Sequence, residues 1–170
     1  DFFQKIEMPL INVLMQMEKE GVYVEQNILN EMSRNIGKRL DRLVEDIYRI
    51  SGSEFNINST QQLAVILFDE LKLNQIKKRS TAENILKELA NDHELPELIL
   101  EYRKLNKLKN TYVDSLPASI NKETSRIHST FNQTIASTGR LSSTGPNFQN
   151  IPIRTEEGRE IRKSFIAQKN

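Results

Sequence analysis

One segment of the chain combines cationic, amide and hydroxyl side chains with a complete lack of acidic ones. Residues 124–155 contain no Asp or Glu, yet they hold Arg126, His128, Arg140 and Arg154 among many Ser, Thr, Asn and Gln residues. Hydroxyl and amide groups donate hydrogen bonds to phosphate and sugar oxygens, and Arg and Asn side chains can reach base edges. The segment therefore favours a nucleic-acid surface, while a polar loop with a chance gap in acids stays the alternative.

Two further groups of basic residues precede this segment. The run Lys77-Lys78-Arg79 interrupts a helical pattern, and Arg103, Lys104, Lys107 and Lys109 follow on a helix. A solvated helix face explains the second group equally well, because charge on the outward face is the ordinary pattern. The net charge of +1, from 24 basic and 23 acidic residues, is therefore an average, and binding depends on where the charges lie.

The sequence shows no residue set for catalysis or metal binding. It has no Cys, which excludes disulfides, thiolate zinc sites, iron–sulfur clusters and cysteine nucleophiles. His93 and His128 have no partner ligand at metal-binding spacing. The acidic pairs Asp69-Glu70 and Glu156-Glu157 are adjacent, so their side chains diverge on a helix and predict surface charge. The sequence also contains no phosphate-cradling glycine loop and no nucleophile elbow.

The length of 170 residues predicts one soluble domain or two small subdomains. No apolar run approaches the ~18–20 residues of a membrane-spanning helix, and the first residues lack the signal-peptide pattern. We therefore expect a cytoplasmic protein without a membrane partner. The first residue is not Met, and residues 164–170 stop where a strand would continue, which favours an excised piece of a longer protein.

The spacing of apolar residues predicts two amphipathic helices early in the chain. One covers residues 6–17, with Pro9 in its first turn or at a kink, and Gly21 supplies its stop. The other covers about residues 27–50 and ends at Ser51-Gly52. At ~24 residues it would be about 36 Å long at 1.5 Å per residue, longer than a compact domain of this size needs.

Shorter helices and one more long helix are predicted next. Asn58 with Gln61, and Ser80 with Glu83, have the spacing of capping boxes that begin two short helices. Pro96 suits the first turn of a last helix, whose apolar face continues to about residue 116. Two long helices joined by short capped ones predict a mainly α fold, a long antiparallel helical hairpin with a small helical tip.

The pattern changes near residue 121, where helical spacing stops. Ile127, Phe131 and Ile135 then share one face of an alternating stretch, which favours a strand. Glycines at 139 and 145 mark turns, and residues 156–166 predict a short helix that leads into another strand. We therefore place a boundary near residue 120, with a small β part after it.

The run from Thr138 to Pro152 reads Thr-Gly-Arg-Leu-Ser-Ser-Thr-Gly-Pro-Asn-Phe-Gln-Asn-Ile-Pro. It resembles, almost residue for residue, the Thr-Gly-Arg-Leu-Ser-Ser…Pro-Asn-Leu-Gln-Asn-Ile-Pro motif of the family A DNA polymerases, the bacterial DNA polymerase I family. The resemblance extends to essentially the whole chain, through residues 7–22, 56–71, 102–112, 131–134 and 154–162.

Three features depart from the family pattern. Gly145 stands where an acidic residue is common, Phe148 stands where Leu is usual, and the basic segment 76–81 is shorter than in many members. These changes leave Arg140 and the Asn and Gln residues of the motif intact, so they do not alter the expectation that the motif faces DNA.

The resemblance implies that the chain divides into three parts. Residues 1–25 lead into the polymerase domain, residues 26–120 form the thumb, and residues 121–170 begin the palm, whose strands are incomplete here. The thumb of this family is a long antiparallel helical hairpin with a small helical tip, and it grips the minor-groove side of primer-template duplex DNA. The implied function is that of a DNA-directed DNA polymerase in replication and repair, located in the bacterial cytoplasm at the nucleoid.

The resemblance also implies which side chains face DNA. Arg140 would reach the minor groove at the primer terminus and check base-pair shape through acceptors that every correct pair presents. Asn147, Gln149 and Asn150 match positions that contact sugars, bases or phosphates near that terminus. The other matching positions lie along the phosphate backbone of the duplex and are occupied by Arg79, Ser80, Asn106, Lys107 and Tyr112.

Polymerisation in this family needs two divalent metals, Mg²⁺ in the parent enzyme, held by carboxylates. Those carboxylates lie in an Asp-Tyr-Ser-Gln-Ile-Glu-like motif and a later His-Asp-Glu motif, both expected beyond Asn170, as is the helix that binds the incoming dNTP. We therefore expect no catalytic residue, metal ligand or cofactor in this chain, which should be inactive alone. The alternative is a helical protein-interaction module without enzymatic role, which explains the amphipathic stripes but not residues 126–154. The oligomeric state is left open by the sequence.

Overall fold

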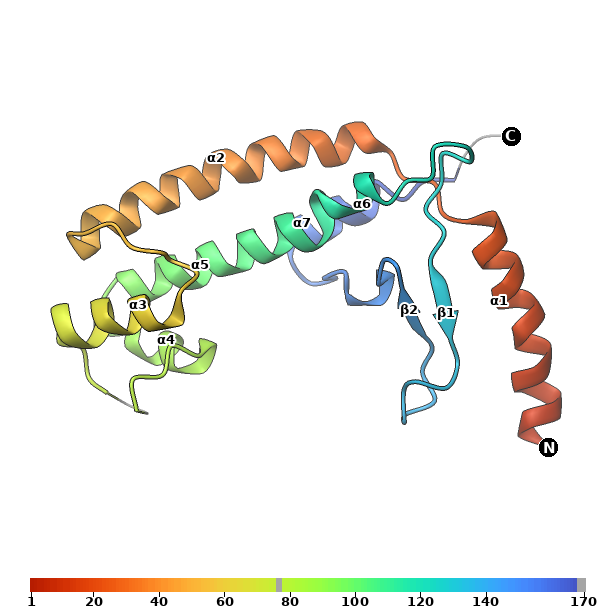
Figure 1. The fold of residues 1–170 in the computed structure, drawn as a ribbon, viewed down its shortest axis with the longest axis horizontal. Helices are drawn as coiled ribbons and strands as arrows, with labels where there is room; N and C mark the ends of the chain where they lie inside the picture. Colours follow the sequence, from red (N-terminus) through yellow and green to blue (C-terminus); the bar gives the residue numbers. More distant parts are fainter. Residues whose placement is uncertain (76–77, 168–170) are drawn as a thin grey trace. The chain divides into compact units, whose positions relative to one another are not determined.

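The computed structural model describes residues 1–75 and 78–167, and its polypeptide forms two compact units (Figure 1). One unit, here called the helical unit, is Arg34–Lys109. The other, here called the split unit, joins Asp1–Ser33 to Asn110–Asn170. The described residues are mainly helical with one two-stranded sheet, which confirms the predicted fold class. Within the described residues, no helix combines the length and the hydropathy that crossing a bilayer requires.

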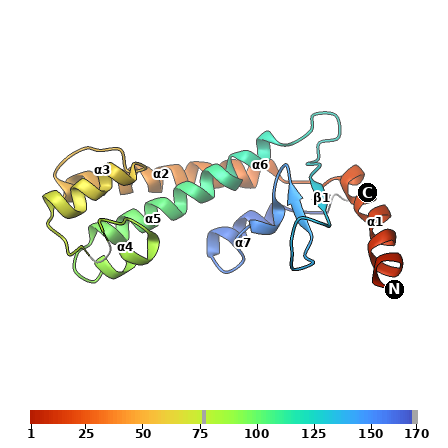
Figure 2. The same cartoon turned by 60° about the horizontal axis from the view of Figure 1, so that its bottom comes forward.

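The helical unit contains the predicted antiparallel hairpin. Helix α2 (Gln26–Ser51) has 26 residues, about 39 Å at 1.5 Å per residue, and helix α5 (Leu95–Leu108) returns along it in both views (Figures 1 and 2). The Arg39 guanidinium donates to the Glu101 carboxylate across the pair at 3.1 Å. Buried apolar side chains from both long helices and from the short ones form one core: Ile47, Ile57, Leu63, Ala64, Ile66, Leu67, Phe68, Ile85, Leu86, Leu89, Leu95 and Ile99.

Short helices close the end of this hairpin, as predicted, but their first residues differ from the prediction. Helix α3 (Thr60–Val65) is capped by Ser59, whose side chain accepts from the Gln62 N–H at 3.3 Å. The Gln62 side chain reaches back and accepts from the Asn56 N–H at 2.6 Å. The N-cap predicted at Asn58 is therefore Ser59, one residue later, and the reciprocal bond of a capping box is not made, because the Ser59 N–H donates to the Asn56 carbonyl oxygen. The Asn56 side chain accepts from the Asn58 N–H in a turn before the helix.

The second predicted capping box is wrong. Helix α4 (Glu83–Leu89) has Ala82 at its N-cap and no side-chain cap. The Ser80 hydroxyl accepts instead from the Ala82 N–H at 3.3 Å, which forms a turn before the helix. Glu83 is the first residue of α4 and pairs with Lys87 one turn later at 2.5 Å, so its carboxylate does not reach back to residue 80.

Helix α5 begins as predicted, with Pro96 in its first turn. It ends at Leu108, after which the chain continues as a π-helical turn (Lys109–Val113) and the short helix α6 (Ser115–Ala118). The predicted helical region up to residue 116 is therefore present, as three consecutive elements rather than one.

The split unit places a small sheet beside helix α1 (Met8–Glu20). Strand β1 (Thr130–Asn132) pairs antiparallel with β2 (Ser142–Thr144), with Phe131 opposite Ser143, and β1 lies between β2 and α1 (Figure 1). A 3-10 turn (Phe148–Asn150) and helix α7 (Glu156–Lys163) follow. The unit's buried apolar residues come from both of its chain segments: Leu14, Val24, Leu29, Tyr112, Val113, Leu116, Ile127, Ile151 and Ile161.

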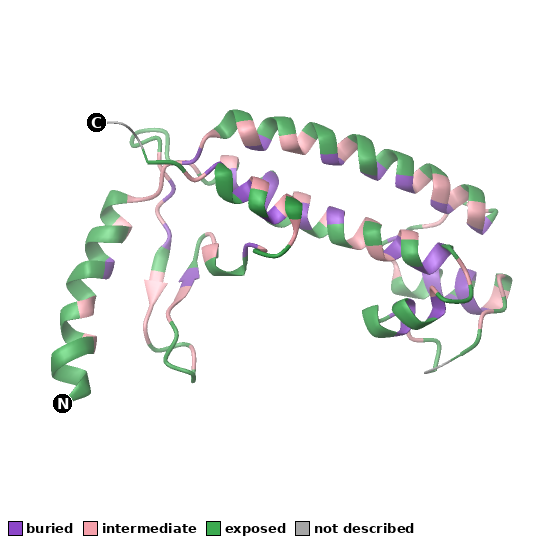
Figure 3. Ribbon diagram, turned by 180° about the vertical axis from the view of Figure 1, so that it is seen from behind, coloured by how far each residue is buried: buried purple, intermediate pink, exposed green. Residues whose placement is uncertain are grey.

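One prediction about this unit is wrong, and another is confirmed with an unexpected exposure. The strand expected to include Ile135 ends at Asn132, and Ile135 is 66% exposed because the chain turns at residue 133, whereas Ile127 is buried. Helix α1 forms, preceded by a π-helical turn (Phe3–Glu7), but its amphipathic stripe is not covered by the described residues. Leu14 is its single buried residue, and most of the helix is exposed in Figure 3.

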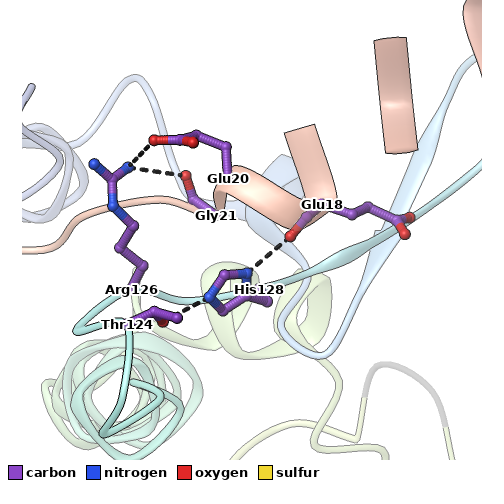
Figure 4. Close-up of polar contacts among 6 residues, drawn as sticks. All are labelled: Glu18, Glu20, Gly21, Thr124, Arg126 and His128. Atoms are coloured by element: carbon purple, nitrogen blue, oxygen red, sulfur yellow. Dashed lines mark hydrogen bonds and ion pairs between the residues drawn. The ribbon is translucent and has the colours of Figure 1, made fainter. Parts of the chain in front are cut away.

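His128 connects the end of α1 to the approach to β1 (Figure 4). Its Nδ1 lies 2.8 Å from the carbonyl oxygen of Glu18, and its Nε2 lies 2.7 Å from the hydroxyl of Thr124. A carbonyl oxygen can only accept, so Nδ1 carries the proton, and in the neutral ring Nε2 accepts from Thr124. The imidazole therefore has a structural role at the base of the β-hairpin.

Backbone and charged groups reinforce this connection. Val22 and Ile127 exchange two backbone hydrogen bonds of 2.8 and 2.9 Å. The Arg126 guanidinium lies 3.2 Å from the Glu20 carboxylate and donates to the carbonyl oxygen of Gly21 at 3.5 Å (Figure 4). Further along, the backbone N–H of Phe131 in β1 donates to the Glu18 carboxylate in α1 at 2.6 Å. The hairpin base is thus held by α1 through several independent contacts.

Gly21 is predicted to be intolerant of a side chain. Its φ of 68° and ψ of −178° lie in a region that is essentially restricted to glycine, and a Cβ would come within 2.8 Å of the His128 ring. We expect Gly21→Ala to lower the free energy of unfolding by about 2–4 kcal/mol, from backbone strain and overpacking together. Urea unfolding followed by circular dichroism measures this loss.

Gly139→Ala is the matched control. Gly139 also has a positive φ, 72°, but among the described residues no atom beyond its two chain neighbours lies within 4 Å of the position that a Cβ would take, so backbone strain alone should cost about 1 kcal/mol. Equal losses in the two variants would contradict the claim that close packing against His128 adds to the cost at position 21.

Candidate nucleic-acid interface

The side chains predicted to face DNA divide between the two units. The split unit holds Tyr112, Arg140, Asn147, Gln149 and Asn150, and the helical unit holds the other four.

Arg140 lies near the end of the loop that joins β1 to β2, two residues before β2. Its side chain is exposed, and among the described residues it has no hydrogen-bond or ion-pair partner. Its sequence neighbours from 124 to 155 include no acid that could neutralise it locally. The guanidinium is therefore free to donate to an acceptor on another molecule.

The turn after β2 brings three of the predicted amides together. Asn147 caps the 3-10 turn, because its Oδ1 accepts from the Gln149 N–H at 3.0 Å. Buried Ser143 supports the same turn, because its Oγ accepts from the Phe148 N–H at 3.0 Å and lies 3.4 Å from the Asn147 Oδ1. Asn147, Gln149 and Asn150 are all exposed. The turn thus directs a row of amide side chains outward while its backbone is bonded inward.

Tyr112 meets this turn from the other side. The side chain is buried, and its hydroxyl donates to the carbonyl oxygen of Asn150 at 2.6 Å. Burial raises the pKa of the Tyr112 phenol above its ordinary value, so the phenol keeps its proton at neutral pH. Because its hydrogen is committed to Asn150, Tyr112 acts in this structure on the position of the turn, and its direct contact with a phosphate stays a prediction.

Residues behind the turn were not singled out in the sequence. Phe148 packs edge-on against Phe165, with ring centroids 5.6 Å apart, and the Arg162 guanidinium donates to the carbonyl oxygen of Ile151 at 3.1 Å. A Cβ on Gly158 would lie 2.3 Å from the carbonyl oxygen of Pro152, so α7 packs against the chain there as closely as a glycine permits. The available signal was this glycine inside a predicted helix, which often marks close packing.

A second buried serine, Ser129, belongs to the same support. The Ser129 hydroxyl lies 2.9 Å and 2.7 Å from the carbonyl oxygens of Thr144 and Pro146 and shares its hydrogen between them. Ser129 and Ser143 are both buried, at 3% and 0% exposed. No local pattern distinguishes them from the many other hydroxyl residues of segment 124–155.

Arg79 is already paired in the helical unit. Two of its guanidinium nitrogens donate to the two Asp69 carboxylate oxygens at 2.5 and 2.6 Å. These hydrogen bonds lower the pKa of Asp69 below its ordinary value. The pair is exposed and therefore contributes little to stability, so a phosphate could replace Asp69 as the partner of Arg79.

The groove beside Arg79 also holds Ser80. It is lined in addition by Arg103, whose guanidinium donates to the carbonyl oxygen of Thr81 at 2.6 Å. Arg103 is half-buried, and its role is to hold the segment before α4 against α5. The structure therefore separates Arg103 from the basic group that the sequence placed on α5.

Asn106 and Lys107 lie in the last turns of α5. The Asn106 amide donates to the Asn58 Oδ1 at 3.4 Å, and the Asn58 amide donates to the Tyr102 hydroxyl at 3.2 Å. The Lys107 side chain is exposed. Lys107 is thus placed to meet a phosphate, whereas Asn106 also links α5 to the turn before α3.

The carboxylates of this chain do not fit a two-metal site. Within residues 1–75 and 78–167, no three His, Asp or Glu side chains converge on a point that could hold a metal ion. Asp69 is committed to Arg79, and Glu156 and Glu157 lie in the first turn of α7.

Comparison with known proteins gives a consistent family. The sequence profile described as DNA polymerase family A matches residues 26–170. The chain is 49% identical over 168 residues to DNA polymerase I of Pseudomonas aeruginosa, covering 95% of this chain and 18% of that protein. It is 46% identical over 172 residues to the thermostable DNA polymerase I of Thermus filiformis, covering 98% of this chain and 21% of that protein. The chain thus spans about a fifth of the length of these relatives.

A solved structure agrees with the sequence comparison. The POL domain of Pol1 from M. smegmatis, in complex with DNA primer-template and dNTP, superposes with a TM-score of 0.90 at 39% identity, covering 98% of this chain and 30% of that one. The profile match over most of the chain, together with this fold, establishes that the chain belongs to DNA polymerase family A.

Proposed function

We propose that the complete protein is a DNA-directed DNA polymerase of the polymerase I type, which acts in replication and repair by template-directed nucleotidyl transfer. In this proposal residues 26–120 are its thumb, residues 121–170 begin its palm, and residues 1–25 lead into the domain. The protein works on nucleoid DNA in the bacterial cytoplasm. The observation that carries the proposal is the acid-free segment around β2, which exposes Arg140 and three amides in a chain of family A.

The chemistry of this segment suits the minor groove of primer-template DNA. The groove edge of every base pair offers acceptors, purine N3 or pyrimidine O2, at similar positions. Arg140 is a donor that needs no particular base, so it can test the shape of a pair without reading its identity. A structural relative was solved with DNA primer-template and dNTP, which supports duplex DNA as the partner.

The helical unit supplies contacts of a different kind. Lys107 and Arg79 carry charges without base information, and Ser80 and Asn106 can donate to phosphate oxygens. Such contacts hold the duplex in register and make the affinity depend on salt. The carboxylates that bind Mg²⁺ and the residues that bind dNTP belong, in this proposal, to the rest of the complete protein.

Lys107→Gln tests the phosphate contact. In the complete polymerase, the slope of log affinity against log salt concentration should fall in magnitude by about one unit, equally for duplexes of any sequence. Fluorescence anisotropy with a labelled primer-template over a salt series measures this slope. Lys87→Gln is the control, because it removes the same charge from a side chain that is paired with Glu83. An identical slope change in both variants would refute a specific role for Lys107.

Arg140→Ala tests the minor-groove contact. In the complete polymerase, we expect extension of a matched primer to slow by about 10-fold or more, and the preference for matched over mismatched primer ends to shrink, while duplex affinity changes less. Single-turnover extension assays on matched and mismatched primers measure both quantities. Arg154→Ala, which removes an exposed Arg from the same segment, should leave the preference unchanged. A preference retained in Arg140→Ala would contradict the assignment.

The 170-residue chain alone should not extend a primer. Incubated with primer-template, dNTPs and Mg²⁺, it should give no product on a gel, because its carboxylates do not form the required metal site. Circular dichroism confirms that the chain is folded in this assay. Template-dependent extension would show that the metal site was assigned to the wrong part of the protein. Failure of the folded chain to bind duplex at low salt would count against DNA binding by this chain alone, and would leave its membership of family A unaffected.

A further inference from the structure

Two consecutive serines of β2 differ in what their hydroxyls do. Ser143 is 0% exposed, and its Oγ contacts two groups of the following turn, the Phe148 N–H at 3.0 Å and the Asn147 Oδ1 at 3.4 Å. The Oγ of Ser142 is buried too, but it has no hydrogen-bond partner among the described residues. One of the two hydroxyls is therefore used to hold the turn, and the other is not.

The donors around Asn147 determine how its amide is oriented. The Gln149 backbone N–H, 3.0 Å away, can only donate, so the atom of Asn147 that faces it must be the oxygen. The Ser143 hydroxyl accepts from Phe148, and its single hydrogen is then directed to the same Asn147 oxygen. Both inward contacts of the amide are thus made by Oδ1. Its nitrogen, with two N–H donors, is left on the exposed side.

This orientation matters for a nucleic-acid partner. Phosphate oxygens and the minor-groove edges of all four base pairs present acceptors, which an outward NH₂ group can meet. A flipped amide would instead present its carbonyl oxygen to those acceptors and would leave the Gln149 N–H without a partner. Loss of that bond opposes the flip, and the Ser143 hydroxyl opposes it further.

We propose that Ser143 is a positioning residue of the DNA interface, which fixes the Asn147 amide with its NH₂ group toward the nucleic acid. The inference rests on the proposed function, because it needs Asn147 to face DNA. Ser143 itself does not touch the DNA. Its effect on binding should therefore pass through Asn147.

A double-mutant cycle tests this dependence. Binding of primer-template duplex by the complete polymerase is measured by anisotropy for Ser143→Ala, Asn147→Ala and the double variant. We expect Ser143→Ala to weaken binding about two- to tenfold, as one lost hydrogen bond would. Asn147→Ala should weaken binding at least as much, and the double variant should equal Asn147→Ala alone. Additive effects in the double variant would overturn the proposal.

Two further variants separate binding from folding. Ser142→Ala removes the neighbouring hydroxyl, which has no partner among the described residues, and should leave affinity unchanged. Equal effects of Ser142→Ala and Ser143→Ala would count against the proposal. Asn147→Ser keeps an N-cap oxygen for Gln149 and therefore the turn, but removes the outward NH₂ group, so it should bind as weakly as Asn147→Ala. Affinity like that of the unmodified protein in Asn147→Ser would overturn the inference.

The same experiment distinguishes this inference from the proposed function. If the unmodified polymerase binds duplex and Asn147→Ala weakens binding while Ser143→Ala does not, only the positioning role is refuted. If the unmodified polymerase does not bind primer-template at low salt, the proposed function fails, and the inference fails with it.

Discussion

The β-hairpin that carries Arg140 depends on the contacts at its base. Its strands have three residues each, and an isolated two-stranded hairpin is at best marginally stable in water. The backbone pairing of Val22 with Ile127 and the His128 bridge to α1 supply what the strands lack. Gly21 makes this possible, because only a residue without Cβ allows the chain to leave α1 so close to the imidazole. The position of Arg140 is therefore set by a helix that lies more than a hundred residues earlier in the sequence.

The turn that follows β2 is likewise held by contacts on its buried side. Its backbone groups are bonded inward to Ser143, Tyr112 and Asn147, so none of them needs the exposed side chains of Gln149 and Asn150. A turn that satisfied its backbone with those side chains could not offer them to a partner. The buried hydroxyls of Ser143 and Tyr112 thus hold the turn, and the exposed amides stay available for binding.

Local patterns predicted the helices well, because periodicity and Pro96 act within a few residues. The errors arose where two neighbouring residues both suit the same N-cap, or where contacts with a distant segment determine the local structure. Asn58 and Ser59 both suit an N-cap, and the Asn56 side chain selects Ser59 by taking the Asn58 N–H. Which serine of β2 bonds to the following turn depends on how that turn folds back, and Ser143 rather than Ser142 meets the Phe148 N–H. The exposed residues of the site followed from the family motif, whereas their buried supports had no local signal.

The predicted DNA contacts of the two units also differ in whether their cations already have an acidic partner. Arg140 lies in a segment without acids, so a hydrogen bond from its guanidinium to an acceptor on the DNA replaces no existing ion pair within that segment. Arg79 must first exchange Asp69 for a phosphate, and the net gain is only the difference between two similar ion pairs. Equal charges at the two sites therefore do not make equal contributions. A contact made by Arg79 should therefore add less to binding than the same contact made by a cation without an acidic partner.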